Sequence, residues 1–404
     1  GVWNDIVTNT FINDGVLSST SNLKVPVNDK DTVLDMVKLI SYSAYFPAVS
    51  SAGGGTAVSS MKTMLINRNR RKIYLIFSTI YITDKLILVL SFKFLSSNLS
   101  GVLYLTKNIY VVGNIRIGGK MGQYPTVLVG CMFYRKHKIV IDPIKGLFER
   151  NVAENLVNIQ ESLSEDTGIP AMIDIFGETD EALARYVEFV SDISDLPILL
   201  NGATAEVRIK SLEKLRENGL LTERIIYTSL NYTSNEREIF LAKKYGIKYF
   251  IVQTFNPRNP FPQGHMEFLL KNGFLKILSK HGVDKIILMP TVLDIPGIGI
   301  ALETIKLFHN RLDYPTAIAP LGVIGYWWRA RENKELKKLF ISSILGYILS
   351  TGVDIIIYGA IRKAKYVFPS VALINSIEGY IARNRGIRLE KNHPFNRYLR
   401  KSIQ

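Results

Sequence analysis

Residues 126–132 read TVLVGCM, and this short apolar run opens the pattern that decides the fold. Turn-forming residues bound the run, and a longer segment with apolar side chains at helical spacing follows at about residues 144–165. Asp142-Pro143 stands before that segment, a pair that favours a helix start. A short buried strand followed by a helix is the repeating unit of parallel β/α proteins. The stretch therefore predicts one strand–helix unit.

Seven more units of the same kind follow. Their expected strands and helices are 171–176 with 180–190, 198–200 with 205–218, 224–228 with 236–245, 249–254 with 266–279, 285–289 with 298–310, 316–319 with 332–350, and 354–358 with 369–384. Eight units in about 260 residues predict an α/β fold, a (β/α)8 TIM barrel whose strands are buried on both faces. The GxGxxG turn of a dinucleotide-binding fold is missing from the sequence. Residues 388–404 read as a basic, fraying end.

The composition is that of a globular protein with excess positive charge. Of 404 residues, 47% are hydrophobic, and 50 Lys and Arg against 35 Asp and Glu give a net charge of +15. This charge indicates either an anionic partner or a generally basic surface, and the scattered basic residues argue against nucleic acid. One cysteine, Cys131, excludes an internal disulfide and a cysteine-based metal site, which favours a reducing, cytoplasmic location. The five histidines lack metal-binding spacing, so we expect no metal.

Residues 1–105 differ from the rest of the chain, because the first glutamate of the sequence is Glu149. Their apolar run 73–95 has the length of a membrane-spanning helix, although Asp84 and Lys85 at its centre oppose insertion. Its β-branched and aromatic residues equally suit two strands joined around 83–85. A third interpretation is an over-extended gene start without structure. We therefore divide the chain into an N-terminal extension, 1–105, and a barrel domain, 106–404.

The functional residues of such a barrel lie at the carboxyl ends of its strands and in the loops that follow. That rule selects mainly amide and hydroxyl side chains: Glu178, Asn201, Thr228, Asn231, Gln253, Asn256 and Asp294, with Cys131, Tyr134, Tyr358 and Arg362. Such a set suits hydrogen-bonded recognition of a polar heterocycle better than metal, Schiff-base or two-carboxylate catalysis. Structural roles compete with this interpretation, because Glu178 and Asp294 also suit helix N-termini.

Several stretches resemble one known family. Residues 118–146, GGKMGQYPTVLVGCMFYRKHKIVIDPIKG, are similar to the opening of the H subunit of tetrahydromethanopterin S-methyltransferase. PAMIDIFG at 170–177, ATAEVR at 203–208 and YGAIRKAKYVFPSVAL at 358–373 continue a resemblance that covers about residues 112–400. It implies a pterin-binding barrel that moves a methyl group from N5 of methyl-tetrahydromethanopterin, or of methyl-tetrahydrofolate in relatives, to the cobalt of a corrinoid. A partner protein carries that corrinoid, so the barrel supplies no metal.

The same resemblance implies a place in archaeal one-carbon metabolism and methanogenesis. The expected partners are a corrinoid-binding protein, a membrane methyltransferase complex to which this chain is peripheral, and further copies of the chain. Basic residues after the first and eighth strands, namely Arg135, Lys136, Lys138 and Arg362, form one lip if those strands are neighbours in a closed barrel. Such a lip receives an anionic substrate tail or an acidic partner.

The chain departs from the family pattern at expected pterin contacts, since family members carry Asp at the place of Asn201 and Asn at the place of Thr228. Two interpretations follow. In the first, the barrel is a methyltransferase with Asn231 and Asp294 as catalytic residues, and its substrate-binding residues are Glu178, Asn201, Thr228, Gln253 and Asn256. In the second, a diverged barrel, non-catalytic or of different specificity, acts as a partner-binding subunit.

Overall fold

The computed structural model describes residues 4–8, 21–25, 61–68, 71–78 and 106–399. Contacts divide the chain into two units, Gly1–Gly101 and Val102–Gln404. In the first unit, two antiparallel pairs form: β1 (Asn4–Thr8) with β2 (Ser21–Val25), and β3 (Met61–Arg68) with β4 (Arg71–Ser78). The apolar run 73–95 therefore begins as a strand, while the expected junction at 83–85 and the second strand after it lie outside the described residues. Among the described helices, none combines the length and apolar character that crossing a bilayer requires.

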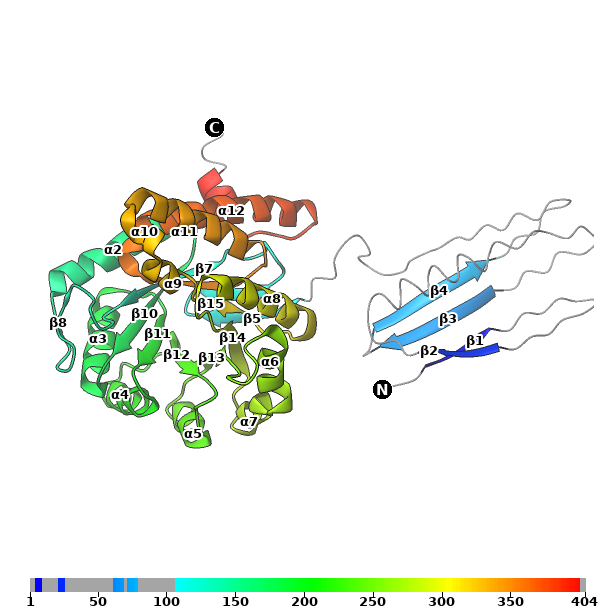
Figure 1. The fold of residues 1–404 in the computed structure, drawn as a ribbon, viewed down its shortest axis with the longest axis horizontal. Helices are drawn as coiled ribbons and strands as arrows, with labels where there is room; N and C mark the ends of the chain where they lie inside the picture. Colours follow the sequence, from blue (N-terminus) through cyan, green and yellow to red (C-terminus); the bar gives the residue numbers. More distant parts are fainter. Residues whose placement is uncertain (1–3, 9–20, 26–60, 69–70, 79–105, 400–404) are drawn as a thin grey trace, which may run out of the picture. The chain divides into compact units, whose positions relative to one another are not determined.

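The second unit is a barrel of eight parallel strands (Figure 1). The strands are β7 (Val127–Met132), β10 (Ala171–Gly177), β11 (Ile198–Gly202), β12 (Ile225–Leu230), β13 (Tyr249–Thr254), β14 (Lys285–Pro290), β15 (Ala317–Ile318) and β16 (Ile355–Ala360). They pair in the order β14-β13-β12-β11-β10-β7-β16-β15. A parallel bridge from Leu288 in β14 to Thr316, just before β15, joins the two ends of the sheet. The predicted (β/α)8 barrel is confirmed, with its first and last strands, β7 and β16, side by side.

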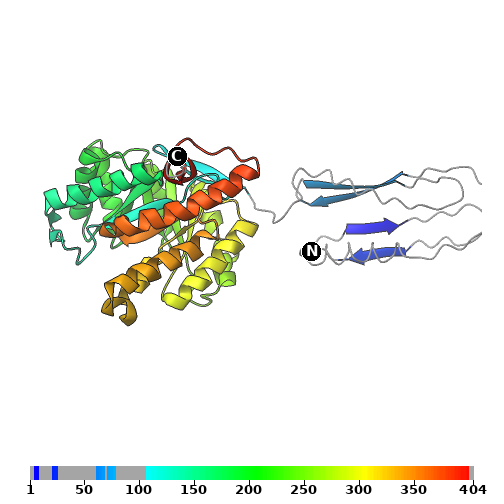
Figure 2. The ribbon, with the colours of Figure 1, turned by 90° about the horizontal axis from the view of Figure 1, so that it is seen from above.

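Helices surround the barrel (Figures 1 and 2). They are α2 (Arg150–Thr167), α3 (Asp180–Ile193), α4 (Ala205–Glu217), α5 (Glu236–Lys244), α6 (Pro262–Met266), α7 (Phe274–Lys280), α8 (Ile295–Arg311), α9 (Leu321–Tyr326), α10 (Trp328–Glu332), α11 (Lys334–Leu349) and α12 (Ala364–Asn384). Single turns η1 (Glu267–Lys271), η2 (Ile361–Lys363) and η3 (Phe395–Leu399) supplement them. Thr179, Thr204 and Asn235 start α3, α4 and α5 by accepting a backbone N–H bond three residues on, which satisfies an otherwise unpaired donor.

The segment between β7 and α2 corrects the predicted helix start. β8 (Val140–Asp142) and β9 (Leu147–Phe148) pair antiparallel there, and α2 begins only at Arg150. Asp142 accepts hydrogen bonds from the backbone N–H groups of Ile144 and Lys145, so it holds a turn and caps no helix. Phe148, which the helical pattern included, packs its ring against Phe133 with centroids 4.9 Å apart. Tertiary packing of that ring overrides the local helical spacing.

The carboxyl end of the chain also differs from the prediction. α12 begins at Ala364 and contains Pro369, where the sequence suggested that the helix starts. Val367 and Phe368, which directly precede the expected start, are fully buried, so packing outweighs the cost of proline within the helix. The expected fraying end is wrong for the described residues up to 399, because His393 and Phe395 are buried.

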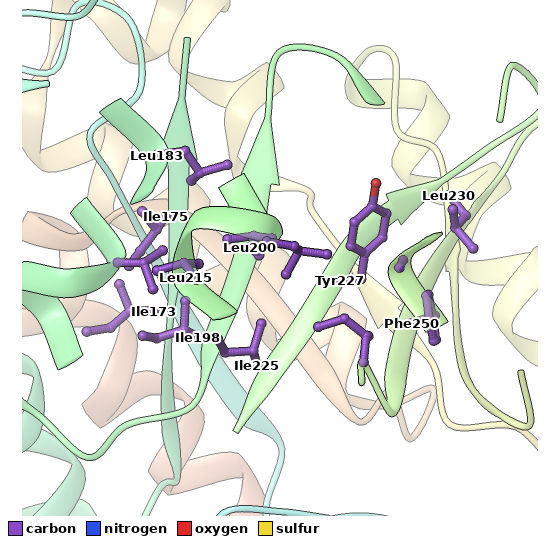
Figure 3. Packing of buried hydrophobic residues seen from close by; sticks show 14 of the residues in the cluster. Ile173, Ile175, Leu183, Ile198, Leu200, Leu215, Ile225, Tyr227, Leu230 and Phe250 are labelled. Atoms are coloured by element: carbon purple, nitrogen blue, oxygen red, sulfur yellow. The ribbon is translucent and has the colours of Figure 1, made fainter. Parts of the chain in front are cut away.

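Two apolar layers hold the barrel together. Outward-facing strand residues such as Ile173 and Ile198 pack with Leu183 and Leu215 from the helices (Figure 3). The residues next to them in the strands point the opposite way and fill the barrel interior with the cluster Val127, Val129, Met172, Leu199, Ile226, Tyr249, Ile251, Ile287, Met289, Ala317, Ile355 and Ile357. This alternation follows from the two-residue period of a strand, and it fixes which side chains face the interior.

A β-hairpin closes the amino-terminal end of the barrel. It consists of β5 (Lys107–Val112) and β6 (Ile115–Gly119), and its Tyr110 and Ile117 join the interior cluster. The Tyr110 hydroxyl accepts a hydrogen bond from the Ile286 N–H at 3.2 Å. Lys107 Nζ forms a buried ion pair with Asp354 Oδ1 at 2.6 Å and donates to the Gly352 carbonyl at 2.7 Å. The hairpin thus covers the amino-terminal end of the barrel interior.

We predict that Lys107→Met lowers the free energy of unfolding by about 3–5 kcal/mol, because it leaves the Asp354 carboxylate buried without its cation. The matched control is Arg116→Gln, which removes an exposed ion pair with Glu390 and should change stability little. Urea unfolding followed by circular dichroism measures both variants. Equal losses in the two would show that the buried pair does not hold the hairpin.

Candidate active site at the carboxyl ends of the strands

One layer of polar side chains lies directly above the apolar interior. Each member follows an interior residue by two positions, so it lies on the same face of its strand. The members are Cys131 on β7, Asp174 on β10, Asn201 on β11, Thr228 on β12 and Gln253 on β13. Five neighbouring strands therefore change from apolar to polar at their carboxyl ends, the position where barrel enzymes carry their active sites.

Asp174 is the buried centre of this layer, with 6% of its surface exposed. Its Oδ1 accepts a hydrogen bond from Asn201 Nδ2 at 3.1 Å, and the Cys131 thiol bonds to the same carboxyl group. Burial raises the pKa of Asp174, while the bonds from Cys131 and Asn201 act in the opposite direction. Burial and the nearby Asp174 raise the pKa of Cys131, so the thiol stays protonated and is a poor nucleophile.

Three predicted binding residues, Asn201, Thr228 and Gln253, lie in this polar layer. Asn201 and Gln253 are half-buried, and Thr228 is 3% exposed. The Thr228 Oγ1 has no hydrogen-bond partner among the described residues. A buried hydroxyl without a partner is costly, so this atom is a candidate for a hydrogen bond to a ligand.

The other predicted residues sit in the loops beyond the strands and hold those loops. Asn231 Oδ1 accepts from the Thr233 backbone at 2.8 Å, and Asn256 Oδ1 accepts from the Arg258 backbone at 3.0 Å. Asp294 caps α8, its Oδ1 accepting from the Gly297 N–H at 2.6 Å. Glu178 is half-buried and directly precedes Thr179, the residue that caps α3. Roles for these four in ligand binding or catalysis remain predictions.

Sequence reasoning missed two residues of this end of the barrel, Asp174 and Lys363. Asp174 carries a signal, since it is the one charged residue in the strand AMIDIFG, but it lies before the strand end at which the barrel rule places functional residues. Lys363 lies in η2, and its Nζ donates to the Tyr358 carbonyl at 3.2 Å. Burial, together with the charges of Lys337 and Arg362, lowers its pKa to about 8. The sequence had pointed only to its neighbour Arg362.

The loop after β7 and the turn after β16 lie together at this end. Burial raises the pKa of Tyr134 by more than the positive charge of Arg362 lowers it. Burial, and to a smaller extent the Arg362 charge, lowers the pKa of His137 to about 4. All four residues of the expected basic lip, Arg135, Lys136, Lys138 and Arg362, are exposed. In the described part of the chain, no three His, Cys, Asp or Glu side chains gather closely enough to hold a metal ion.

Fold and site together define a (β/α)8 barrel whose carboxyl end presents a buried carboxyl group among amides and hydroxyls. Residues 106–390 match the family described as the tetrahydromethanopterin S-methyltransferase MtrH subunit, and the chain belongs to this methyltransferase family. The H subunit of tetrahydromethanopterin S-methyltransferase from Methanothermobacter marburgensis is 32% identical over 299 residues, which cover 71% of this chain and 96% of that protein. The corresponding protein of Methanothermobacter thermautotrophicus, which carries the same name, is 31% identical over 299 residues, 71% of this chain and 96% of that protein.

Among solved structures, the chain is similar to Yersinia pestis dihydropteroate synthase with a pterine-sulfa conjugate. It is 12% identical to this chain, with a TM-score of 0.48, and the match covers 68% of this chain and 99% of that one.

We predict a specific pH dependence of stability from Asp174. The folded protein holds the Asp174 proton more tightly than the unfolded chain does, because burial raises the pKa above its ordinary 3.8. The contribution of Asp174 to the free energy of unfolding is therefore largest below about pH 3.8, and it falls as the pH rises above this value. Asp174→Asn cannot titrate. The difference between wild type and this variant in urea unfolding should thus shrink, or change sign, from about pH 4 to pH 7; parallel curves would contradict it.

Proposed function

We propose that this protein transfers the methyl group from N5 of a methyl-tetrahydropterin to the cobalt of a corrinoid carried by a partner protein. Tetrahydromethanopterin is the donor that the family's description supports, and methyl-tetrahydrofolate is the alternative donor. The observation that carries the proposal is the buried Asp174 carboxyl group at the carboxyl end of β10, paired with Asn201.

The Asp174–Asn201 pair supports recognition of the pterin edge. That edge is guanidine-like and presents neighbouring N–H donors, which a carboxylate accepts in a two-pronged contact. The resemblance places a family carboxylate at the position of Asn201, so its loss there put the site in question. Asp174 provides a carboxylate one strand away, and it is hydrogen-bonded to the residue that took the family position.

We assign further ligand contacts to the hydrogen-bonding atoms that each side chain does not use within the protein. Asn231 uses its Oδ1 within its own loop, which leaves its amide N–H groups for a ring nitrogen or N5. Asp294 uses one oxygen as a helix cap and offers the other as a carboxylate near the reacting group. Thr228 brings its unpaired hydroxyl. Gln253, Asn256 and Glu178 complete the polar wall as binding residues.

The relatives are named as subunits, and we infer that this chain also works in a complex. Its proposed partners are the corrinoid protein and a membrane methyltransferase complex, with the chain peripheral to the membrane and repeated in a homo-oligomer. The chain itself would bind the pterin and deliver the methyl group. The corrinoid would supply the cobalt nucleophile that accepts it.

A second candidate function is a partner-binding barrel without this catalysis. α9 and α10 follow β15 at the same end of the barrel, and they expose Tyr326 and Trp328 at 79% and 56%. Arg331 stands over the Tyr326 ring and Arg329 over the Trp328 ring. Exposed aromatic and arginine side chains are typical of protein interfaces, so this surface would serve either function.

Calorimetry with methyl-tetrahydromethanopterin and methyl-tetrahydrofolate tests the proposal. We expect wild type to bind one of them, and Asp174→Asn to bind it about 10- to 100-fold more weakly, because a neutral amide replaces the charged acceptor. Asp192→Asn, an exposed change on α3, is the matched control and should bind as wild type does. If wild type gives no heat of binding with either pterin, the methyltransferase proposal is contradicted and the partner-binding function is favoured.

The basic lip gives a prediction about salt. Replacing Lys136, Lys138 and Arg362 together by Gln should slow methyl transfer strongly at about 20 mM salt and weakly at about 300 mM, since salt screens exposed charges. The control replaces Lys244, Lys271 and Lys276, which are exposed on other elements, and should leave the salt dependence unchanged. Initial rates measure both. An equal effect at the two salt concentrations would show that these basic residues do not steer a substrate or partner to the site.

A further inference from the structure

Lys363 reaches back over the last strand of the barrel. Gly359 lies at a β-bulge near the end of β16, where Ile357 is opposite Val129 of β7 and Gly359 is opposite Gly130. A Cβ atom built on Gly359 would lie 3.3 Å from the Nζ atom of Lys363. The ammonium group of Lys363 therefore lies beside Gly359, whose backbone also contacts the Cys131 thiol. One of its N–H groups donates to the Tyr358 carbonyl, which leaves two for a ligand.

The ammonium continues the polar layer around the barrel. The Cys131 thiol contacts both the Gly359 backbone and the Asp174 carboxyl group, and Asp174 in turn bonds to Asn201. The row thus runs across four adjacent strands, β16, β7, β10 and β11. Adjacent strands are about 4.8 Å apart, so Gly359, where the Lys363 ammonium stands, and Asp174 are on strands about 10 Å apart. A bicyclic heterocycle that is hydrogen-bonded to Asp174 at one edge and to Lys363 at the other would span a comparable distance.

We propose that Lys363 is the general acid of the methyl transfer, donating its proton to N5 as the methyl group leaves. This inference rests on the proposed function. The bond between N5 and the methyl carbon breaks, and its electron pair stays on N5. The carbon bonds to the electron pair of the reduced cobalt, while the proton passes from Lys363 Nζ to N5. Lysine is left as the neutral amine and regains a proton from water.

The surroundings of Lys363 suit such an acid. Arg362 on the same turn and Lys337 on α11 face it with positive charge, and the Cys131 thiol faces it from β7. Tyr134, His137 and Tyr366 stand around Arg362 on the neighbouring elements. Burial and the two cations bring the pKa of Lys363 to about 8, so most of it is protonated at neutral pH. The asparagine amides of the site have no proton of comparable acidity to give.

The test compares the pH profile of methyl transfer from methyl-tetrahydromethanopterin to free cob(I)alamin. Wild-type kcat should fall as pH rises through about 8, since the acid must be protonated. Lys363→Met should lower kcat by about 100-fold and lose this limb, while the affinity for the pterin changes little. Lys363→Arg, which stays charged, should move the limb to higher pH. Lys365→Met, exposed two residues away on α12, is the control and should match wild type in rate and profile.

A second measurement uses the unmodified protein and needs no turnover. The rate at which acetic anhydride modifies Lys363, followed by mass spectrometry of the full chain, should rise with a midpoint near pH 8. Bound methyl-tetrahydromethanopterin should protect Lys363 and leave Lys365 reactive. If Lys363→Met transfers the methyl group as fast as wild type and with the same pH profile, or if the bound pterin does not protect Lys363, the role of Lys363 is overturned. The proposed function would still stand. No pterin binding by wild type overturns the proposed function and this role with it.

Discussion

Closure of the eight-stranded sheet, completed by the parallel bridge between Leu288 and Thr316, is the constraint on which the rest of this structure depends. Once the sheet closes, every second side chain of each strand faces a common interior. Apolar residues of all eight strands, from Val127 to Ile357, fill that interior, and the hairpin of β5 and β6 covers its amino-terminal end. The inward positions left over lie at the carboxyl ends of the strands. The polar layer there is a consequence of closure combined with the two-residue period of the strands.

Burial shifts the pKa values of Asp174 and Lys363 in opposite directions. These are the two ionisable groups at this end of the barrel that the sequence analysis missed. Burial raises the pKa of the Asp174 carboxyl and lowers the pKa of the Lys363 ammonium, so each group is biased toward its neutral form. Asn201 and Cys131 partly compensate Asp174, and the Tyr358 carbonyl accepts one bond from Lys363. A ligand that offers N–H donors to Asp174 and a basic nitrogen to Lys363 would satisfy both. Both groups therefore carry an unfavourable desolvation, which the heterocycle of the proposed function would relieve on binding.

The charge at this end of the barrel extends from the polar layer to the surface. Lys363 lies half-buried, Arg362 beside it is exposed, and the basic loop after β7 approaches from the neighbouring strand. The exposed rings of α9 and α10 follow β15, which is the other neighbour of β16. The proposed function thus places substrate chemistry and partner contact on adjoining parts of one face. That arrangement suits an enzyme whose second substrate is carried by another protein.

The sequence by itself determined the eight strand–helix units, because apolar runs, helical spacing and capping residues such as Thr179 and Thr204 are local signals. It also placed Asn201, Thr228 and Gln253 at strand ends, where a barrel gathers its functional groups. The sequence did not predict where α2 begins, because the contact between Phe148 and Phe133 overrides a helical pattern. Only the tertiary structure decided that Asp174 faces Asn201 and Cys131, and that Lys363 stands over Gly359. The contacts of Asp174 depend on the register of β10 with β7 and β11, and the pairing of β7 with β16 brings Gly359 and Lys363 close to Cys131, all residues distant in the sequence.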